Sequence, residues 1–154
     1  MPPARSKARK RALDLLFEAE LRGVPVLDLL AERAAPVPGS GPRVPGSGPP
    51  VPGYAAELVR GVAAHSADID ELISRYAEGW TLDRMPAVDR NVLRIGVYEL
   101  LWEPDVPRGV AISEAVLLAG DLSTDASPAF VNGLLARIAE LRQSESGGRS
   151  GAAP

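Results

Sequence analysis

Apolar residues recur along most of this chain at the spacing that places them on one face of a helix. In residues 8–22, four apolar side chains form a stripe with a period near 3.6 residues, namely Leu13, Leu16, Phe17 and Leu21. This period is typical of an amphipathic helix that packs on a core. Gly23 and Pro25 follow directly and predict its end.

The same period predicts further helices over residues 27–33, 54–65, 66–76, 86–102, 113–122 and from 127 onward. Thr81 is placed to cap a short turn at 82–85, and Pro86 suits the first position of the helix that follows it. Gly133 inside the last helix favours close helix packing over the alternative of an RNA contact. No segment alternates apolar and polar residues with a period of two, so a sheet is not expected. The fold class predicted is all-α, a bundle of about seven helices.

Two segments depart from this pattern. Residues 36–53 read PVPGSGPRVPGSGPPVPG, with seven prolines and five glycines, and contain a seven-residue repeat. Proline removes amide donors and glycine raises the entropy cost of ordering, so a flexible linker is predicted there. Residues 143–154 are small and polar and predict a disordered tail. The expected organisation is one domain, residues 1–142, with the linker inside it.

Composition narrows the class of protein. With 154 residues the chain is long enough for one domain, it has no cysteine, and His65 is its single histidine. Disulfides, cysteine-based zinc sites and histidine clusters are therefore excluded. No apolar run approaches the ~20 residues of a membrane span, and no secretory signal begins the chain, so a cytoplasmic location is expected. No nucleophile–base pair or phosphate-binding loop can be found, which predicts a protein that is not an enzyme and has no cofactor or metal.

Charge is unevenly distributed. Residues 5–11 read RSKARKR, five cations in seven positions, whereas the rest of the chain has 12 Lys and Arg against 20 Asp and Glu. A basic segment continuous with a helix can bind phosphates at one end of an otherwise acidic protein. Recognition of single-stranded RNA also needs aromatic side chains on which bases stack. Phe17 and Phe130 are candidates, although their spacing fits core positions better.

Several stretches together resemble the NusB family. RKRALDLLFEAE (residues 9–20) is similar to the family's opening helix, and PAVDRNVLRIGVYELLW (86–102) to its central helix. The stretch from 105 to 138 is similar to its C-terminal half, with FVNGLL (130–135) as the most specific part. These motifs occur in the family's order and, with residues 54–60 and 79–84, cover nearly all of the chain except the linker and the tail.

The resemblance implies two small helical bundles packed together, and a transcription antitermination factor. Such a factor binds the boxA element of ribosomal RNA leader transcripts jointly with a small-subunit ribosomal protein, NusE. It joins other Nus factors on RNA polymerase and suppresses premature, Rho-dependent termination. The RNA contacts implied are the basic residues Arg5, Lys7, Arg9 and Lys10, and residues 123–130, including Asp125, Ser127 and Phe130. The ribosomal-protein contact implied is Asp89, with Arg90 beside it.

One departure from the family pattern concerns charge. Many relatives carry two adjacent acids before the serine of the Phe-Val-Asn-Gly block, and here the second is Ala126. Losing that acid removes a repulsion of phosphate, so we expect stronger RNA binding. The competing interpretation of the whole chain is a helical protein-interaction module whose basic segment only aids solubility. The sequence leaves the oligomeric state open, a homodimer included.

Overall fold

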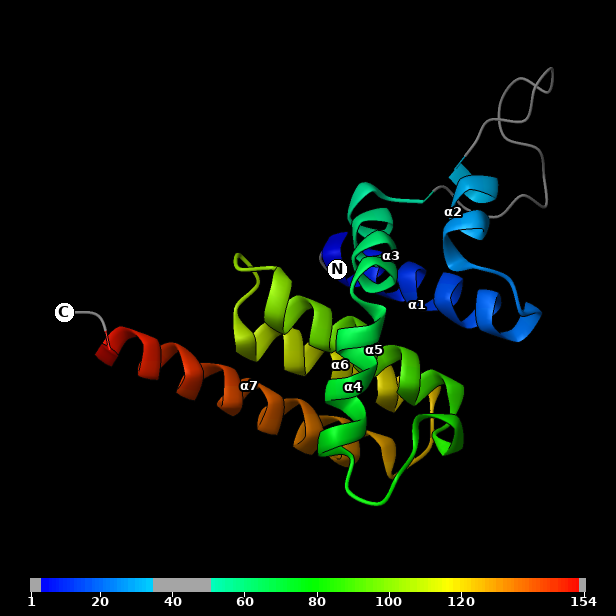
Figure 1. The fold of residues 1–154 in the computed structure, drawn as a ribbon. Coiled ribbons are helices and arrows are strands. Elements are labelled where there is room, and N and C mark those ends of the chain that lie inside the picture. The colour runs from blue at the N-terminus through cyan, green and yellow to red at the C-terminus, as the bar shows by residue number, and fades with distance from the viewer. Residues whose placement is uncertain (1–3, 35–50, 153–154) are drawn as a thin grey trace. The chain divides into compact units, whose positions relative to one another are not determined.

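The computed structural model describes residues 4–34 and 51–152, with side chains for 4–33 and 51–140. These residues form seven α-helices and one short 3₁₀ helix, and no strand occurs in the described ranges. In chain order the elements are α1 (Ala4–Arg22), α2 (Val26–Ala34), α3 (Gly53–Ala64), α4 (Ser66–Tyr76), η1 (Leu82–Arg84), α5 (Ala87–Trp102), α6 (Arg108–Leu122) and α7 (Ser127–Ala152). The prediction of an all-α fold is confirmed (Figure 1).

The chain divides into two compact units, residues 1–64 and residues 65–154. In the first unit, α1 packs on α2 and α3, and α2 packs on α3. Small side chains let these helices approach closely, because Ala8, Ala12, Ala19 and Ala55 are all buried. Glu18 of α1 also forms ion pairs with Arg22 and with Arg33 of α2.

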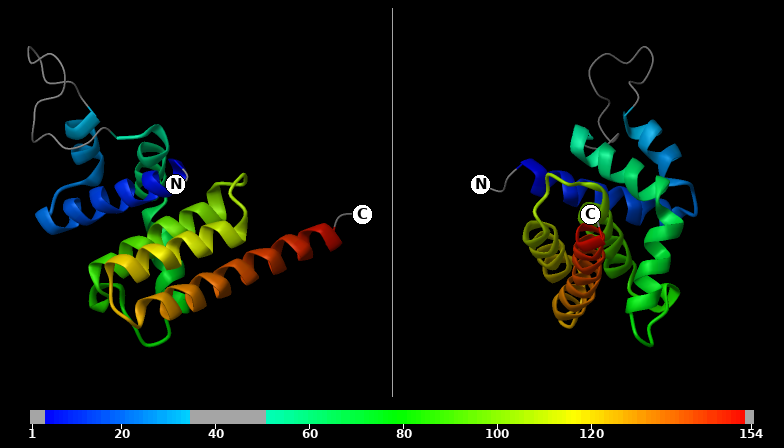
Figure 2. Two further views of the ribbon diagram at one scale, coloured as in Figure 1. Left: turned by 180° about the vertical axis from the view of Figure 1, so that it is seen from behind. Right: turned by 60° about the vertical axis from the view of Figure 1, so that its left-hand side comes forward.

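The second unit is built on α5, the helix that the sequence pattern predicts to be central. Helices α5, α6 and α7 lie side by side, and α4 packs on α5 and α7 (Figure 2). The large side chains that are fully buried here include Ile69, Ile73, Leu93, Ile95, Leu134, Leu135 and Ile138. Arg94 of α5 donates to both carboxylate oxygens of Asp70 on α4, at 2.9 and 3.0 Å, which ties these two helices together.

A glycine allows α5 and α7 to come together. A Cβ atom added to Gly96 would lie 2.8 Å from Cδ1 of Leu135 and 3.6 Å from the Cβ of Ala115. Gly133 is different, because the nearest atom to its added Cβ is the Arg137 guanidinium at 4.0 Å. The prediction of close helix packing at Gly133 is therefore wrong, and Gly96 is the glycine that serves this purpose in α5.

Helix positions follow the hydrophobic period, but several starts differ from the prediction. Helix α1 begins at Ala4 rather than near residue 8, because Ala, Arg and Lys all favour helix and no breaker follows Pro3. Helix α6 begins at Arg108, directly after Pro107, rather than at Ser113. Pro86 occupies the N-cap position of α5 instead of its first turn, and Thr81 precedes η1 without a side-chain capping hydrogen bond.

Most of the predicted linker, residues 36–50, lies outside the described residues. The backbone of α7 is helical to Ala152, past residue 143, where the sequence pattern predicts that order ends. The division into one domain with a linker and a tail stays a prediction. No helix in the described ranges has the length and apolar character needed to cross a membrane.

Candidate nucleic-acid interface

One face of α1 carries exposed cations together with an aromatic ring. Lys7, Lys10, Asp14, Phe17 and Leu21 recur at intervals of three and four residues, so they share a stripe along the helix. All five are exposed, and Phe17 retains 37% of its surface. The stripe thus presents two predicted phosphate contacts and one predicted stacking residue on the same side of one helix. We refer to these five residues as the α1 stripe.

The other predicted cations of α1 turn toward α3. The guanidinium carbon of Arg5 lies 4.4 Å from the ring centroid of Tyr54, and that of Arg9 lies 5.9 Å from it. Cation–π contacts of this kind attach the first turns of α1 to the start of α3. Arg5 remains exposed, but Arg9 retains only 3% of its surface. Burial argues against a direct phosphate contact by Arg9, whose predicted RNA role stays untested.

Asp14 is the one acid on the α1 stripe. Partial burial of its carboxyl group raises the pKa of Asp14, and the nearby charges of Lys10 and Arg11 oppose that rise. The burial effect is the larger of the two. The negative charge of Asp14 is therefore less stable than that of a fully hydrated aspartate.

The second predicted RNA segment, residues 123–130, begins with a buried polar network. Asp89, in the first turn of α5, accepts a hydrogen bond from Ser123 Oγ at 2.5 Å and another from Ser127 Oγ at 2.9 Å. The backbone N–H of Thr124 donates to Ser127 Oγ at 3.2 Å. Asp89 retains 4% of its surface and Ser127 retains 1%. This network fixes the turn between α6 and α7 against the start of α5.

The remaining residues predicted to contact RNA or a partner differ in how exposed they are. Asp125 lies at the surface and Phe130 is half-buried. Arg90 donates to the backbone carbonyls of Leu82 and Met85, at 2.5 and 3.0 Å, and thereby holds η1 against α5. Asp89 and Arg90 thus both form hydrogen bonds within the second unit. Their predicted contact with a ribosomal protein is untested.

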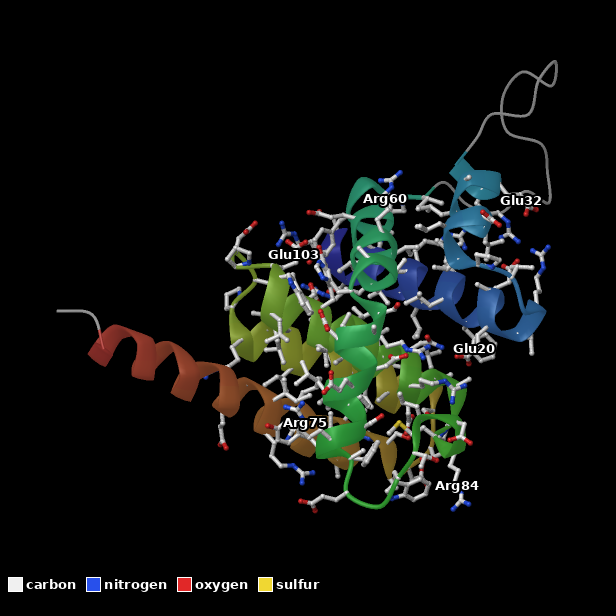
Figure 3. The ribbon with its side chains drawn as sticks, viewed as in Figure 1. Glu20, Glu32, Arg60, Arg75, Arg84 and Glu103 are labelled. Carbon is white, nitrogen blue, oxygen red and sulfur yellow. The ribbon has the colours of Figure 1, made fainter. Side chains whose placement is uncertain are left out.

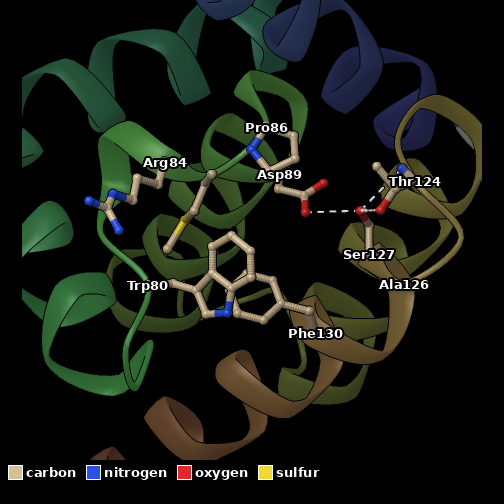
Figure 4. Close-up of a pocket in the computed structure, with 9 residues that line it drawn as sticks. Trp80, Arg84, Pro86, Asp89, Thr124, Ala126, Ser127 and Phe130 are labelled. Carbon is tan, nitrogen blue, oxygen red and sulfur yellow. Dashed lines mark hydrogen bonds between the residues drawn. The ribbon is translucent and has the colours of Figure 1, made fainter.

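A pocket of about 510 Å³ opens beside this network (Figure 4). Its apolar lining consists of Trp80, Met85, Pro86, Ala126 and Phe130. Its polar lining consists of Asp89, Thr124, Ser127 and Arg84. The volume falls within the roughly 300–1,000 Å³ of small-molecule sites, and the mixture of many apolar and few polar groups is typical of them. Arg84 itself is exposed (Figure 3).

Trp80 is the aromatic residue of this pocket that the sequence analysis did not identify. It lies in the turn between α4 and η1, outside any helical stripe, so the hydrophobic period gave it no role. The indole retains 53% of its surface, and its ring centroid lies 6.3 Å from that of Phe130, with the planes inclined by 56°. A tryptophan in a turn between two predicted helices, outside any apolar stripe, was the signal available in the sequence.

His65 is predicted from the sequence to be a surface or capping residue. It occupies the N-cap position of α4 without a side-chain capping bond, and its ring stacks on Trp102 with 4.1 Å between centroids. Among the described residues, no group of three or more histidine, cysteine or acidic side chains is arranged to hold a metal ion.

Comparison with known proteins gives consistent matches over most of the chain. The model of the NusB family matches residues 6–140. The transcription antitermination protein NusB of Salinispora tropica is 59% identical over 138 residues, which cover 90% of this chain and 96% of that protein. The structure of NusB from T. maritima is 37% identical with a TM-score of 0.74, covering 91% of this chain and 93% of that one. A crystal structure of the antitermination factors NusB and NusE in complex with double-stranded RNA is 26% identical with a TM-score of 0.67, covering 89% and 96%.

Proposed function

This chain belongs to the NusB family of transcription antitermination proteins, and on that premise we propose that it binds RNA together with a ribosomal protein of the NusE type. The observation that carries the proposal is the α1 stripe, with exposed Lys7 and Lys10 and the half-exposed ring of Phe17 on one side of a helix. Lysine gives affinity for the RNA backbone, and an aromatic ring offers a face for a base. The related complex of NusB, NusE and double-stranded RNA supports the same pair of partners.

The finer proposal concerns the RNA and the larger assembly. The target is the boxA element of ribosomal RNA leader transcripts, and the bound complex joins RNA polymerase with other Nus factors in the cytoplasm. The role is binding and not catalysis. Residues 123–130 of the second unit supply the second RNA contact, through exposed Asp125 and Ala126 and half-buried Phe130.

Binding across a salt series tests the proposal. A boxA-like RNA and a scrambled RNA of equal composition are titrated, with and without the ribosomal protein, and the logarithm of the affinity is followed against the logarithm of salt concentration. We expect tighter binding of the boxA-like RNA and a further gain with the partner. Lys7→Gln/Lys10→Gln should reduce the slope by about 0.7 for each phosphate that is no longer neutralised.

A matched control removes two exposed cations elsewhere. Arg60→Gln/Arg75→Gln changes the net charge by the same amount on α3 and α4, and it should leave the slope close to that of the unaltered protein. The proposal would be overturned if both RNAs bind equally weakly and the ribosomal protein does not change their affinity. That result would favour a protein-interaction module instead, an alternative supported by the exposure of Leu21 (76%) and Leu117 (60%).

A further inference from the structure

We propose that the pocket beside Trp80 receives one nucleobase turned out of the bound RNA strand, and that Trp80 is the ring on which this base stacks. The inference rests on the proposed RNA-binding function and adds a residue and a ligand class to it. The pocket is lined on the second unit by the turn before η1, the start of α5 and residues 124–130.

The aromatic groups of the pocket are arranged for stacking. The Trp80 and Phe130 planes are inclined by 56°, so the phenyl ring does not lie flat on the indole. More than half of the Trp80 surface remains exposed, in a protein whose other described aromatic residues are mostly better covered. The flat face of a base can therefore contact the indole, and such contacts are tolerant of sequence because every base has a π face.

Charge fixes which end of a nucleotide enters. The carboxylate of Asp89 is buried in the polar wall of the pocket, and a negative group there repels phosphate. Arg84 lies exposed at the rim, where a cation attracts phosphate. The base therefore points inward and its phosphate stays outside.

The turn that carries Trp80 is held in place from α7. Glu78 and Gly79 both have positive φ angles, 31° and 84°, which is unusual for glutamate. Arg137 Nη1 forms an ion pair with Glu78 Oε1 at 3.1 Å, and Arg137 Nε donates to the carbonyl of Gly133 at 3.2 Å. Since Phe130 lies on the same helix, this ion pair links the Trp80 turn to the helix that carries the opposite ring of the pocket.

The experiment is a scan of abasic RNA. A series of boxA-like oligonucleotides, each lacking one base, is titrated against the unaltered protein and against Trp80→Ala. We expect one position at which base removal weakens binding to the unaltered protein about tenfold, a loss of ~1.4 kcal/mol. Trp80→Ala should bind the intact RNA about tenfold more weakly and be insensitive to base removal at that same position.

Several variants distinguish the loss of base stacking from the loss of apolar volume and from misfolding. Trp80→Phe should retain the position-specific effect because it keeps a π face, whereas Trp80→Leu should lose it although it keeps apolar bulk. Trp102→Phe alters the other tryptophan, outside the pocket, and should bind like the unaltered protein. Arg137→Gln should weaken binding in the unaltered background but not in the Trp80→Ala background, as expected for a residue that acts only through Trp80. The helical circular dichroism signal confirms folding of each variant.

The outcomes for the pocket and for RNA binding are distinct. If the unaltered protein binds RNA with the expected salt dependence but Trp80→Ala shows the same abasic profile, the pocket inference is overturned and the proposed function stands. If Trp80→Ala and Trp80→Leu weaken the binding of every oligonucleotide equally, Trp80 does not contact one particular base. The inference then also fails. If the unaltered protein does not bind the RNA, both proposals fail together.

Discussion

The carboxylate of Asp89 joins the start of α5 to the turn before α7. It accepts hydrogen bonds from two serine hydroxyls although it is almost fully buried. A buried carboxylate is stable only when its oxygens are satisfied in this way, since desolvation of the charge is otherwise costly. Asp89 therefore stabilises the second unit whether or not it also meets a partner protein.

Replacing this acid should lower stability. Asp89→Ala removes the buried carboxylate that accepts from the hydroxyls of Ser123 and Ser127, and we expect the free energy of unfolding to fall by about 2–3 kcal/mol. Urea unfolding measures the loss, and Asp83→Ala, which removes an exposed acid of η1, serves as the control. Asp89→Ala with unchanged stability would show that the network contributes nothing, and the predicted partner contact would then be the better explanation of this acid.

Ala126 is exposed at the edge of the pocket, next to Asp125. Ala126→Asp adds a second negative charge where RNA phosphates are expected, so the affinity for RNA should fall about threefold or more, by ~0.7 kcal/mol. The loss should shrink as salt is raised, because exposed charges are screened. Ala126→Asn has nearly the same shape without the charge and should bind like the unaltered protein. An affinity for the aspartate variant that equals or exceeds that of the unaltered protein contradicts the prediction.

Asp14 should make the free energy of unfolding depend on pH, and partial burial of its carboxyl group sets the sign of that dependence. Because its pKa is raised in the folded protein, its ionised form disfavours folding above that pKa, and the penalty disappears as pH falls through it. Asp14→Asn should therefore be slightly more stable than the unaltered protein at neutral pH, by less than about 0.5 kcal/mol, as is usual for surface positions. The difference should vanish in acid. Urea midpoints at neutral and acidic pH measure it, and a less stable variant at neutral pH would mean that attraction to Lys10 and Arg11 outweighs burial.

At the scale of helices, the hydrophobic period predicted where the elements lie. It could not predict which polar residues are buried, because that depends on contacts between residues far apart in the chain. Helix α5 was predicted to within a residue, because apolar residues, a preceding proline and following prolines all agree. The Asp89–Ser127 bond spans 38 positions, and the Arg9–Tyr54 contact joins α1 to α3, which are separated in the chain by α2. Local patterns contain no information on such pairs, so burial of Arg9, Asp89 and Ser127 could not be foreseen.

The approach of α5 to α7 depends on the missing side chain at Gly96. Gly96→Val would force atoms against Leu135, which is fully buried, and we expect a loss of about 1–3 kcal/mol in unfolding free energy. Gly109→Val makes the same change at an exposed helical position where an added Cβ meets nothing within 4 Å, so it introduces no clash. Thermal unfolding of the pair isolates the packing effect. Equal melting temperatures would show that Leu135 moves aside freely.

At the scale of the whole molecule, the two candidate RNA contacts lie on different compact units. The α1 stripe belongs to residues 1–64 and the Trp80 pocket to residues 65–154. The family resemblance implies RNA contacts at both ends of the chain. The pocket between Trp80 and Phe130 was not foreseen, because three separate segments of the chain build it.

Shortening the proline- and glycine-rich segment tests its role as a linker. Deleting residues 44–50, one copy of the repeat, should leave both the melting temperature and the RNA affinity nearly unchanged, since even halving a loop alters its closure entropy by only about 0.6 kcal/mol. Thermal unfolding and RNA titration measure the two quantities. A clear fall in either one would mean that this segment makes specific contacts.

Because α1 begins at Ala4, its basic first turns should also resist proteases. Residues 5–11 contain five cleavage sites for enzymes that cut after lysine or arginine. Such enzymes need an extended chain, so a helix packed on α3 is cut only after it unfolds locally. The same seven residues in an unfolded arm would be among the first to be removed. We therefore expect helix formation to slow the removal of this basic segment by such enzymes.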